Sequence, residues 1–183
     1  MEHNNVFRLI KSDFFRYVSD NDSKLLIIAK YFHNPGMQFS VIYRLEHFLI
    51  QHNNYYIRFF GLCFYPFYFV YTYYFLTYHI EPWVEIGEGL FLHNHDIVVA
   101  DSVNIGKNFT CMGQVTIGLD FTSGDASVCI LDDVRIGAGA KIISKGKVLI
   151  SRGVTIGANS VVTKSIVIEN STWVGIPAKI VKK

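Results

Sequence analysis

Two histidines and an aspartate lie within one short segment, His93-Asn94-His95-Asp96. Free imidazole titrates near physiological pH, so a neutral histidine is available to take a proton from a hydroxyl group. A neighbouring carboxylate can hold the other ring N–H, as in catalytic triads, or can simply face water. The segment is therefore a candidate for general-base chemistry, and the alternative is a pair of solvated loop histidines.

The sequence around this segment repeats with a period of six residues. Between residues 86 and 180 an aliphatic residue recurs at every sixth position, often followed by glycine. The phase is unbroken at Ile156, Val162, Ile168, Val174 and Ile180. Six fits neither the α-helical period nor the alternation of a flat strand, but it fits short strands joined by tight corners around an axis. An antiparallel sandwich, the alternative, has no fixed six-residue phase, so the pattern predicts a parallel β-helix.

Three interruptions break the repeat. One extra residue lies in or near 93–96, a second slip falls within 119–127, and a third falls within 144–147. Insertions in a solenoid form loops, and loops on one face often build the binding site. We therefore expect the two histidines to lie on a binding face.

The composition argues against several other classes of protein. A formal net charge of +2 over 183 residues is too small to indicate nucleic-acid binding. Cys63, Cys111 and Cys129 are widely separated and form no CxxC pair, so neither a disulfide framework nor a metal site is expected. The first residues lack the basic and apolar regions of a cleaved secretory signal. These features predict a cytoplasmic location.

Residues 1–80 are expected to form an α-helical region, and residues 81–183 the β-helix. Asn34-Pro35-Gly36 breaks the chain before an apolar-periodic helix. In that helix Val41, Leu45 and Phe48 share one face with Leu49, while Arg44 and His47 lie off it. These helices are predicted to pack against the rest of the protein.

The segment 59–78 contains no charged side chain. Its length fits a membrane span, but Pro66, Gly61 and six tyrosines argue against one. We favour an aromatic helical hairpin that is buried or faces another subunit. The second interpretation is contact with a membrane surface or a glycosyltransferase, which would place the protein peripherally at the inner face of the membrane.

Several motifs resemble those of hexapeptide-repeat acyltransferases, in particular the serine acetyltransferase-like and polysaccharide O-acetyltransferase branch. They include Val-Thr-Ile-Gly at 115–118, Ile-Gly-Ala-Gly-Ala at 136–140, Ile-Gly-Ala-Asn-Ser-Val-Val-Thr-Lys at 156–164 and Val-Gly-Ile-Pro-Ala-Lys at 174–179. The helix Tyr43-Arg44-Leu45-Glu46-His47 after Pro35-Gly36 is similar as well. The resemblance therefore covers most of the chain from about residue 34 onward.

This resemblance implies a left-handed parallel β-helix, a homotrimer and transfer of an acetyl group from acetyl-CoA to a hydroxyl, with a histidine as general base. Counted back from Ile97, the family's histidine falls on His93. Counted forward from Gly89 it falls on Asn94, which leaves His95 as a second candidate. Asp96 is a further candidate, for orienting one of the two rings.

The resemblance also implies where the coenzyme binds. Ala138 and Ala158 match small residues along which the pantetheine arm lies. Thr163, Lys164 and Lys179 match positions near the nucleotide end, where cations suit phosphates. The alternative for the lysines is a solvated face.

Two departures from the family's serine-using members bear on the acceptor. Ala126-Ser127-Val128 stands where those members have Arg-His-Pro, and His79-Ile80-Glu81-Pro82 stands where they have Asp-Ile-His-Pro. Loss of the arginine removes a bidentate partner for a free amino acid's carboxylate. We therefore predict an acetyl-CoA-dependent O-acetyltransferase acting on a sugar or polysaccharide intermediate, with serine O-acetyltransferase and a non-catalytic trimeric scaffold as the alternatives.

Overall fold

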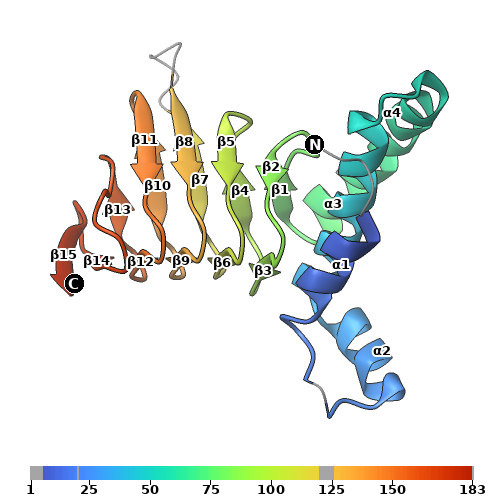
Figure 1. The fold of residues 1–183 in the computed structure, drawn as a ribbon, viewed down its shortest axis with the longest axis horizontal. Helices are drawn as coiled ribbons and strands as arrows, with labels where there is room; N and C mark the ends of the chain where they lie inside the picture. Colours follow the sequence, from blue (N-terminus) through green and yellow to red (C-terminus); the bar gives the residue numbers. More distant parts are fainter. Residues whose placement is uncertain (1–5, 20, 120–125, 183) are drawn as a thin grey trace.

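The repeat forms a β-solenoid in the computed structural model, which describes residues 6–19, 21–119 and 126–182 (Figure 1). Sheet A contains β1 (Tyr78–Ile80), β4 (Ile97–Val99), β7 (Thr116–Leu119), β10 (Lys141–Ser144) and β13 (Val161–Val162). Sheet B contains β2 (Glu85–Ile86), β5 (Val103–Ile105), β8 (Ser127–Ile130) and β11 (Lys147–Ile150). Sheet C contains β3 (Phe91–Leu92), β6 (Thr110–Cys111), β9 (Arg135–Ile136), β12 (Thr155–Ile156), β14 (Thr172–Val174) and β15 (Lys179–Lys182). The predicted parallel β-helix is confirmed.

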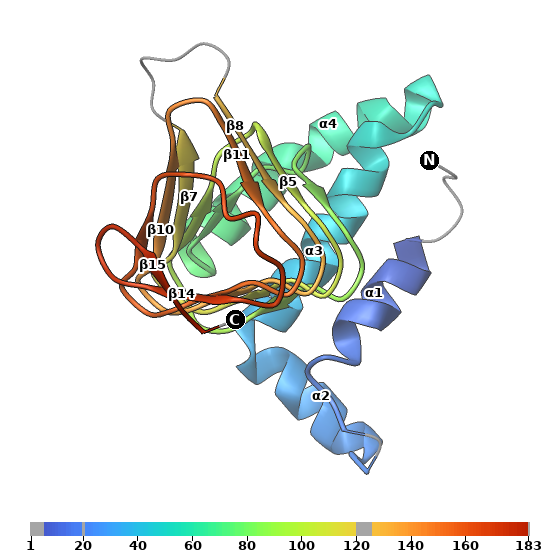
Figure 2. The same ribbon diagram turned by 60° about the vertical axis from the view of Figure 1, so that its left-hand side comes forward.

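The register of the strands explains the repeat in the sequence. Ile86, Ile105, Ile130 and Ile150 lie opposite one another in consecutive coils of sheet B, and all four are buried. One aliphatic residue per side of the triangle thus fills a narrow core, while the backbone groups of each coil bond to those of the next (Figure 2). The last strand, β15, departs from this pattern because it pairs with β14 in antiparallel fashion.

Helices cover the end of the solenoid at which β1 begins (Figures 1 and 2). They are α1 (Val6–Phe14), α2 (Lys24–His33), α3 (Pro35–Gln51) and α4 (Tyr55–Val70), followed by the π-helical turn η1 (Tyr71–Phe75). The predicted break at residue 34 is confirmed, because the Asn34 side chain accepts hydrogen bonds from the backbone N–H groups of Gly36 and Met37 at the start of α3. The first strand, β1, begins before the boundary expected at residue 81.

The face of α3 that packs inward differs from the predicted one. Arg44, expected off the packed face, is 1% exposed, whereas Leu45 is exposed. Arg44 forms an ion pair with the buried Asp13 of α1, with 2.9 Å between its Nε and the carboxylate, and donates to the carbonyl oxygens of Ile86 and Gly87. Because Asp13 neutralises the guanidinium, Arg44 can be buried on the face of α3 that hydropathy alone would leave exposed.

The prediction that residues 59–78 form a helical hairpin of their own is wrong. The segment continues as one helix, α4, through Pro66 and then widens into η1, whose end is marked by a bond from the Leu76 N–H to the Tyr71 carbonyl. Proline cannot donate to the carbonyl four residues earlier, but the helix continues through Pro66 to Val70. The antiparallel partner of α4 is α3. Among the described residues, no helix is both long and apolar enough to cross a membrane.

Candidate active site

The extra residue near the two histidines widens the corner between β3 and β4. Four residues, 93–96, connect Leu92 to Ile97, and Asn94 and Asp96 both have positive φ, 67° and 63°. The next coil turns the same corner with a single such residue, Gln114, whose φ is 61°. The predicted slip thus becomes a local bulge that carries His93 and His95 outward, where both are exposed.

His95 has an ordered ring. Its Nδ1 lies 3.1 Å from the carbonyl oxygen of Leu76, and the ring stacks on Tyr78 with 6.4 Å between centroids. A carbonyl only accepts hydrogen bonds, so Nδ1 carries the proton and Nε2 keeps a free lone pair. That tautomer is the one a general base requires. The Leu76 carbonyl thus orients the His95 ring, and the backbone N–H of Asp96 bonds to the Thr77 hydroxyl. The role expected for the Asp96 carboxylate stays a prediction.

His93 lies on the other side of the same corner. Its backbone N–H continues the ladder with the Cys111 carbonyl at 2.8 Å, and its ring stacks parallel on Phe91, with 6.1 Å between centroids. Phe91 packs in turn against Tyr17 and beneath the guanidinium of Arg16. His93 is therefore accessible from solvent and supported by an aromatic stack.

The helical region positions this corner directly. The Tyr17 hydroxyl accepts from the Leu92 N–H at 2.8 Å and lies 3.2 Å from the Leu92 carbonyl oxygen, one residue before His93. Gly36 approaches so closely that an added Cβ would lie 2.1 Å from the same carbonyl oxygen. The backbone that carries the histidines is thus fixed by α3 and by the residues after α1.

The predicted coenzyme residues Ala138 and Ala158 follow along the same edge of the solenoid, where sheet C turns into sheet A. Both are exposed, and the N–H of Asn159, next to Ala158, bonds to the Ala138 carbonyl at 2.8 Å. Their glycine neighbours keep the corner narrow, since a Cβ on Gly137 would meet the backbone nitrogen of Ala158 at 2.6 Å. Three coil spacings separate His93 from Ala158, so this edge extends over about 14 Å with the small side chains of Ala138 and Ala158 on its outside.

A cavity lies at the last coil of the solenoid. It has a volume of 330 Å³ and brings together the three residues predicted at the nucleotide end, Thr163, Lys164 and Lys179. Trp173 and Pro177, which were not predicted as site residues, also line it. Pro177 stands within the closing motif at 174–179, which was the available signal. An indole face beside two ammonium groups suits a flat base attached to phosphates.

Comparisons with known proteins agree with this geometry. No protein-family model matches the sequence. The chain is 40% identical over 114 residues to serine acetyltransferase from Staphylococcus xylosus, which covers 61% of this chain and 51% of that protein. It is 42% identical over 106 residues to serine acetyltransferase from Staphylococcus aureus strain N315, which covers 57% and 48%. The chain therefore spans about half the length of the curated relatives it matches.

Two solved structures match almost the whole chain. Serine acetyltransferase from Brucella abortus in complex with coenzyme A has a TM-score of 0.78 at 26% identity, covering 97% of this chain and 68% of that one. A serine acetyltransferase in complex with cysteine has a TM-score of 0.76 at 27% identity, covering 97% and 70%. This chain has the fold of serine acetyltransferases. The predicted resemblance is thereby confirmed.

Within the serine acetyltransferase fold, the second slip lies at a different corner from the histidines. Residues 120–125 of that slip fall outside the described part of the chain. Ala126 and Ser127 follow at the start of β8, where sheet A turns into sheet B, and Ala126 is buried. The slips therefore enlarge two different corners, because the first slip joins sheet C to sheet A whereas the second and third join sheet A to sheet B.

Proposed function

We propose that the protein is an acetyl-CoA-dependent O-acetyltransferase. The observation that carries this proposal is the set of two histidines and small residues along one edge of the solenoid, together with a cavity at the last coil that contains Lys164 and Lys179. A thioester at the histidines, with its pantetheine arm along Ala138 and Ala158, places the nucleotide phosphates at the lysines. The serine acetyltransferase relatives, one with coenzyme A bound, support this assignment.

The proposed chemistry needs one base and no metal. A neutral imidazole takes the proton of the acceptor hydroxyl while its oxygen attacks the thioester carbonyl. The tetrahedral intermediate then breaks its C–S bond, and the departing sulfur takes the proton from the imidazolium. The resemblance favours His93 for this role, whereas the hydrogen bond of His95 to Leu76 gives that ring the required tautomer. We propose that one of these two residues is the base.

L-serine is the acceptor that the comparisons support better. The curated relatives are serine acetyltransferases, and one structural neighbour contains cysteine, which has the shape of serine. A sugar hydroxyl, as in polysaccharide synthesis, is the second candidate. It is favoured by Ala126 and Ser127, neither of which can form the bidentate contact to an amino-acid carboxylate that an arginine would form.

A trimer would unite the two separated parts of the site. The histidine corner and the corner that contains Ala126 lie on different edges of one solenoid. Packing three solenoids side by side brings a corner of one protomer against a different corner of the next. We propose this arrangement for the enzyme.

Purified protein and acetyl-CoA test the proposal through the release of free thiol. We expect release with L-serine or with a hydroxyl found by mass spectrometry in a panel of sugars, and the productive acceptor identifies the substrate class. His93→Ala and His95→Ala should be compared with His33→Ala, an exposed histidine of α2. Loss of the base should lower kcat by about 10² to 10⁴ with coenzyme binding unchanged. Absence of CoA binding in calorimetry would instead support a non-catalytic scaffold.

A further inference from the structure

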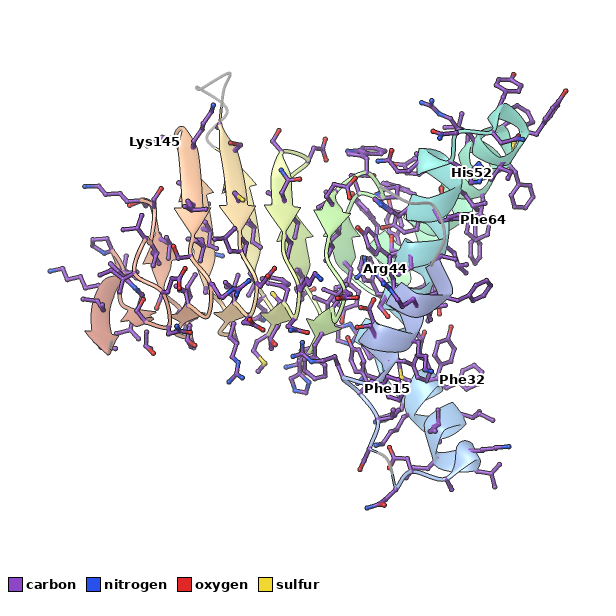
Figure 3. The ribbon with its side chains drawn as sticks, viewed as in Figure 1. Phe15, Phe32, Arg44, His52, Phe64 and Lys145 are labelled. Atoms are coloured by element: carbon purple, nitrogen blue, oxygen red, sulfur yellow. The ribbon has the colours of Figure 1, made fainter. Side chains whose placement is uncertain are left out.

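Large apolar side chains are exposed on the helices that cover the β1 end of the solenoid. We call these residues the helical apolar surface; its most prominent members are Phe7, Leu25, Phe32, Tyr56, Phe60 and Phe67. Each is more than half exposed, with Tyr56 at 80% and Phe60 at 62%. Figure 3 shows that Phe32 and Phe64 lie on the side of the helices away from the solenoid. A single exposed apolar residue is normal, but a set of this extent marks an interaction surface.

The helix α4 shows most clearly that this surface needs a partner. Its inner side is used, since Gly61 packs against Leu49 of α3 and Tyr68 is fully buried. Its outer side is also apolar, with Phe59, Leu62 and Phe67 all more than half exposed. A helix that is apolar all round is normally covered by protein or by lipid.

The charges on the helices select between possible partners. Among the described residues, the four helices and η1 contain only two acidic side chains, Asp13 and Glu46, and both are buried. Their exposed charges are all basic, at Arg8, Lys11, Lys24 and Arg58, and of these Arg8 pairs with Glu88 of the solenoid at 3.7 Å. Of the remaining acidic residues in this part of the sequence, Asp22 is paired with Lys30, and Glu2 and Asp20 lie outside the described residues. The surface thus offers aromatic rings and cations to its partner.

A second copy of the same surface does not complement this pattern. A two-fold interface would set each cation near another cation, with no exposed acidic residue of the described helices to offset them. An anionic bilayer does complement it. Tyrosines such as Tyr55, Tyr56 and Tyr74 have apolar rings and polar tips that suit the headgroup region, while the phenylalanines reach the acyl chains and the cations meet lipid phosphates.

We propose that the helical apolar surface docks the protein on a membrane surface that contains anionic lipid. The helices lie at one end of the long axis of the molecule (Figure 1), so the solenoid and its candidate active-site edge project away from the bilayer. This attachment is peripheral, in keeping with the absence of a helix long and apolar enough to cross a membrane among the described residues. It is independent of the acceptor used in catalysis.

Sedimentation with vesicles tests the proposal on the full chain. The vesicles contain phosphatidylcholine alone or phosphatidylcholine mixed with phosphatidylglycerol. We expect binding to the mixed vesicles that weakens as salt is added, and little binding to phosphatidylcholine alone. Arg58→Glu should weaken binding by more than the roughly fivefold expected for the loss of one surface cation.

Matched serine variants distinguish binding through the helical apolar surface from non-specific hydrophobic binding to vesicles. Phe60→Ser and Phe67→Ser should each weaken vesicle binding by about tenfold. Ile176→Ser and Val181→Ser remove apolar side chains that are 75% and 61% exposed at the far end of the molecule, and should leave binding unchanged. All four variants should retain the circular dichroism spectrum of the parent.

Three results would overturn the proposal. One is no difference between the two vesicle compositions, and another is equal loss of binding in the far-end variants. The third is a concentration-dependent association, measured by sedimentation velocity without lipid, that Phe60→Ser and Phe67→Ser abolish. That result would assign the surface to protein contacts. Retained thiol release by the Phe60→Ser variant would show that a loss of docking is separate from the proposed catalytic function.

Discussion

Replacement of Arg44 by methionine should destabilise the protein far more than replacement of an exposed arginine. Arg44 is 1% exposed, and its guanidinium holds the Asp13 carboxylate and two carbonyl oxygens of the first coil. Methionine keeps much of the apolar volume but leaves a buried carboxylate without its counter-charge. Breaking a buried pair in this way costs about 3–5 kcal/mol of unfolding free energy.

Arg152→Met is the matched control. Arg152 pairs with Asp132 at 2.8 Å, but its side chain is 57% exposed, so its loss should cost at most about 1 kcal/mol. Arg44→Lys should fall between the two, because an ammonium keeps the charge but cannot reproduce the forked contacts. Urea unfolding at one fixed protein concentration, followed by circular dichroism, measures all three.

The pH dependence adds a second measurement on the same variant. Burial raises the pKa of Asp13, and the charge of Arg44 opposes that shift. Without Arg44 the pKa rises further, so folding favours the protonated carboxyl and stability falls as the pH rises. The deficit of Arg44→Met should therefore shrink in acid. Equal losses for Arg44→Met and Arg152→Met, or a deficit that grows in acid, would refute this account of the helix–solenoid junction.

Three further predictions follow from the structure. Burial raises the pKa of Glu46 from 4.5 to about 7, and neither carboxylate oxygen has a hydrogen-bond partner among the described residues. Its contribution to stability is thus full below pH 4.5 and is lost as the pH rises through 7. Glu46→Gln should therefore raise the unfolding free energy by about 3 kcal/mol at pH 8 and leave it unchanged at pH 4, and urea titrations at the two pH values measure the difference. Ala158→Phe should put a bulky ring where the pantetheine arm is proposed to lie and weaken acetyl-CoA binding more than about tenfold in calorimetry. Arg152→Phe, at another corner, should not. Lys164→Ala and Lys179→Ala should each weaken CoA binding by about tenfold. If these lysines hold the 3′-phosphate, the two variants should weaken the binding of dephospho-CoA by less. Equal effects on both ligands would place the lysines elsewhere along the nucleotide.

The solenoid was predictable because its physical rule is local and repeated. An inward aliphatic residue on each side of the triangle gives a period that survives in the sequence even where a loop interrupts it, as Leu92 and Ile97 show on either side of the bulge. The alignment of Ala138 and Ala158 was predictable for the same reason, since the two residues occupy equivalent positions in consecutive coils. What each interruption does in space was harder to foresee, because a slip in phase does not say which of the three corners it enlarges.

The helical region shows where reading from the sequence fails. Hydropathy places Leu45 inside and Arg44 outside, but the buried Asp13 lies in a different helix, and no helical period reveals such a partner. The continuation of α4 through Pro66 is a similar case. Packing of Tyr68 and Gly61 against neighbouring segments holds a helix whose local sequence suggests a break. The tautomer of His95 likewise depends on a carbonyl group that lies far from it in the sequence.

The contacts between the helices and the first coil also bear on aggregation. A β-solenoid begins with three open strand edges, and each edge is a template for another chain. Here the carbonyl oxygen of Ile80 in β1 accepts from Tyr68, that of Ile86 in β2 accepts from Arg44, and both backbone groups of Leu92 in β3 meet the Tyr17 hydroxyl. Each sheet thus ends on a side chain from the helical region. Removal of these helices would leave three unpaired strand edges that face one direction. The expected product is a fibre of solenoids stacked end to end.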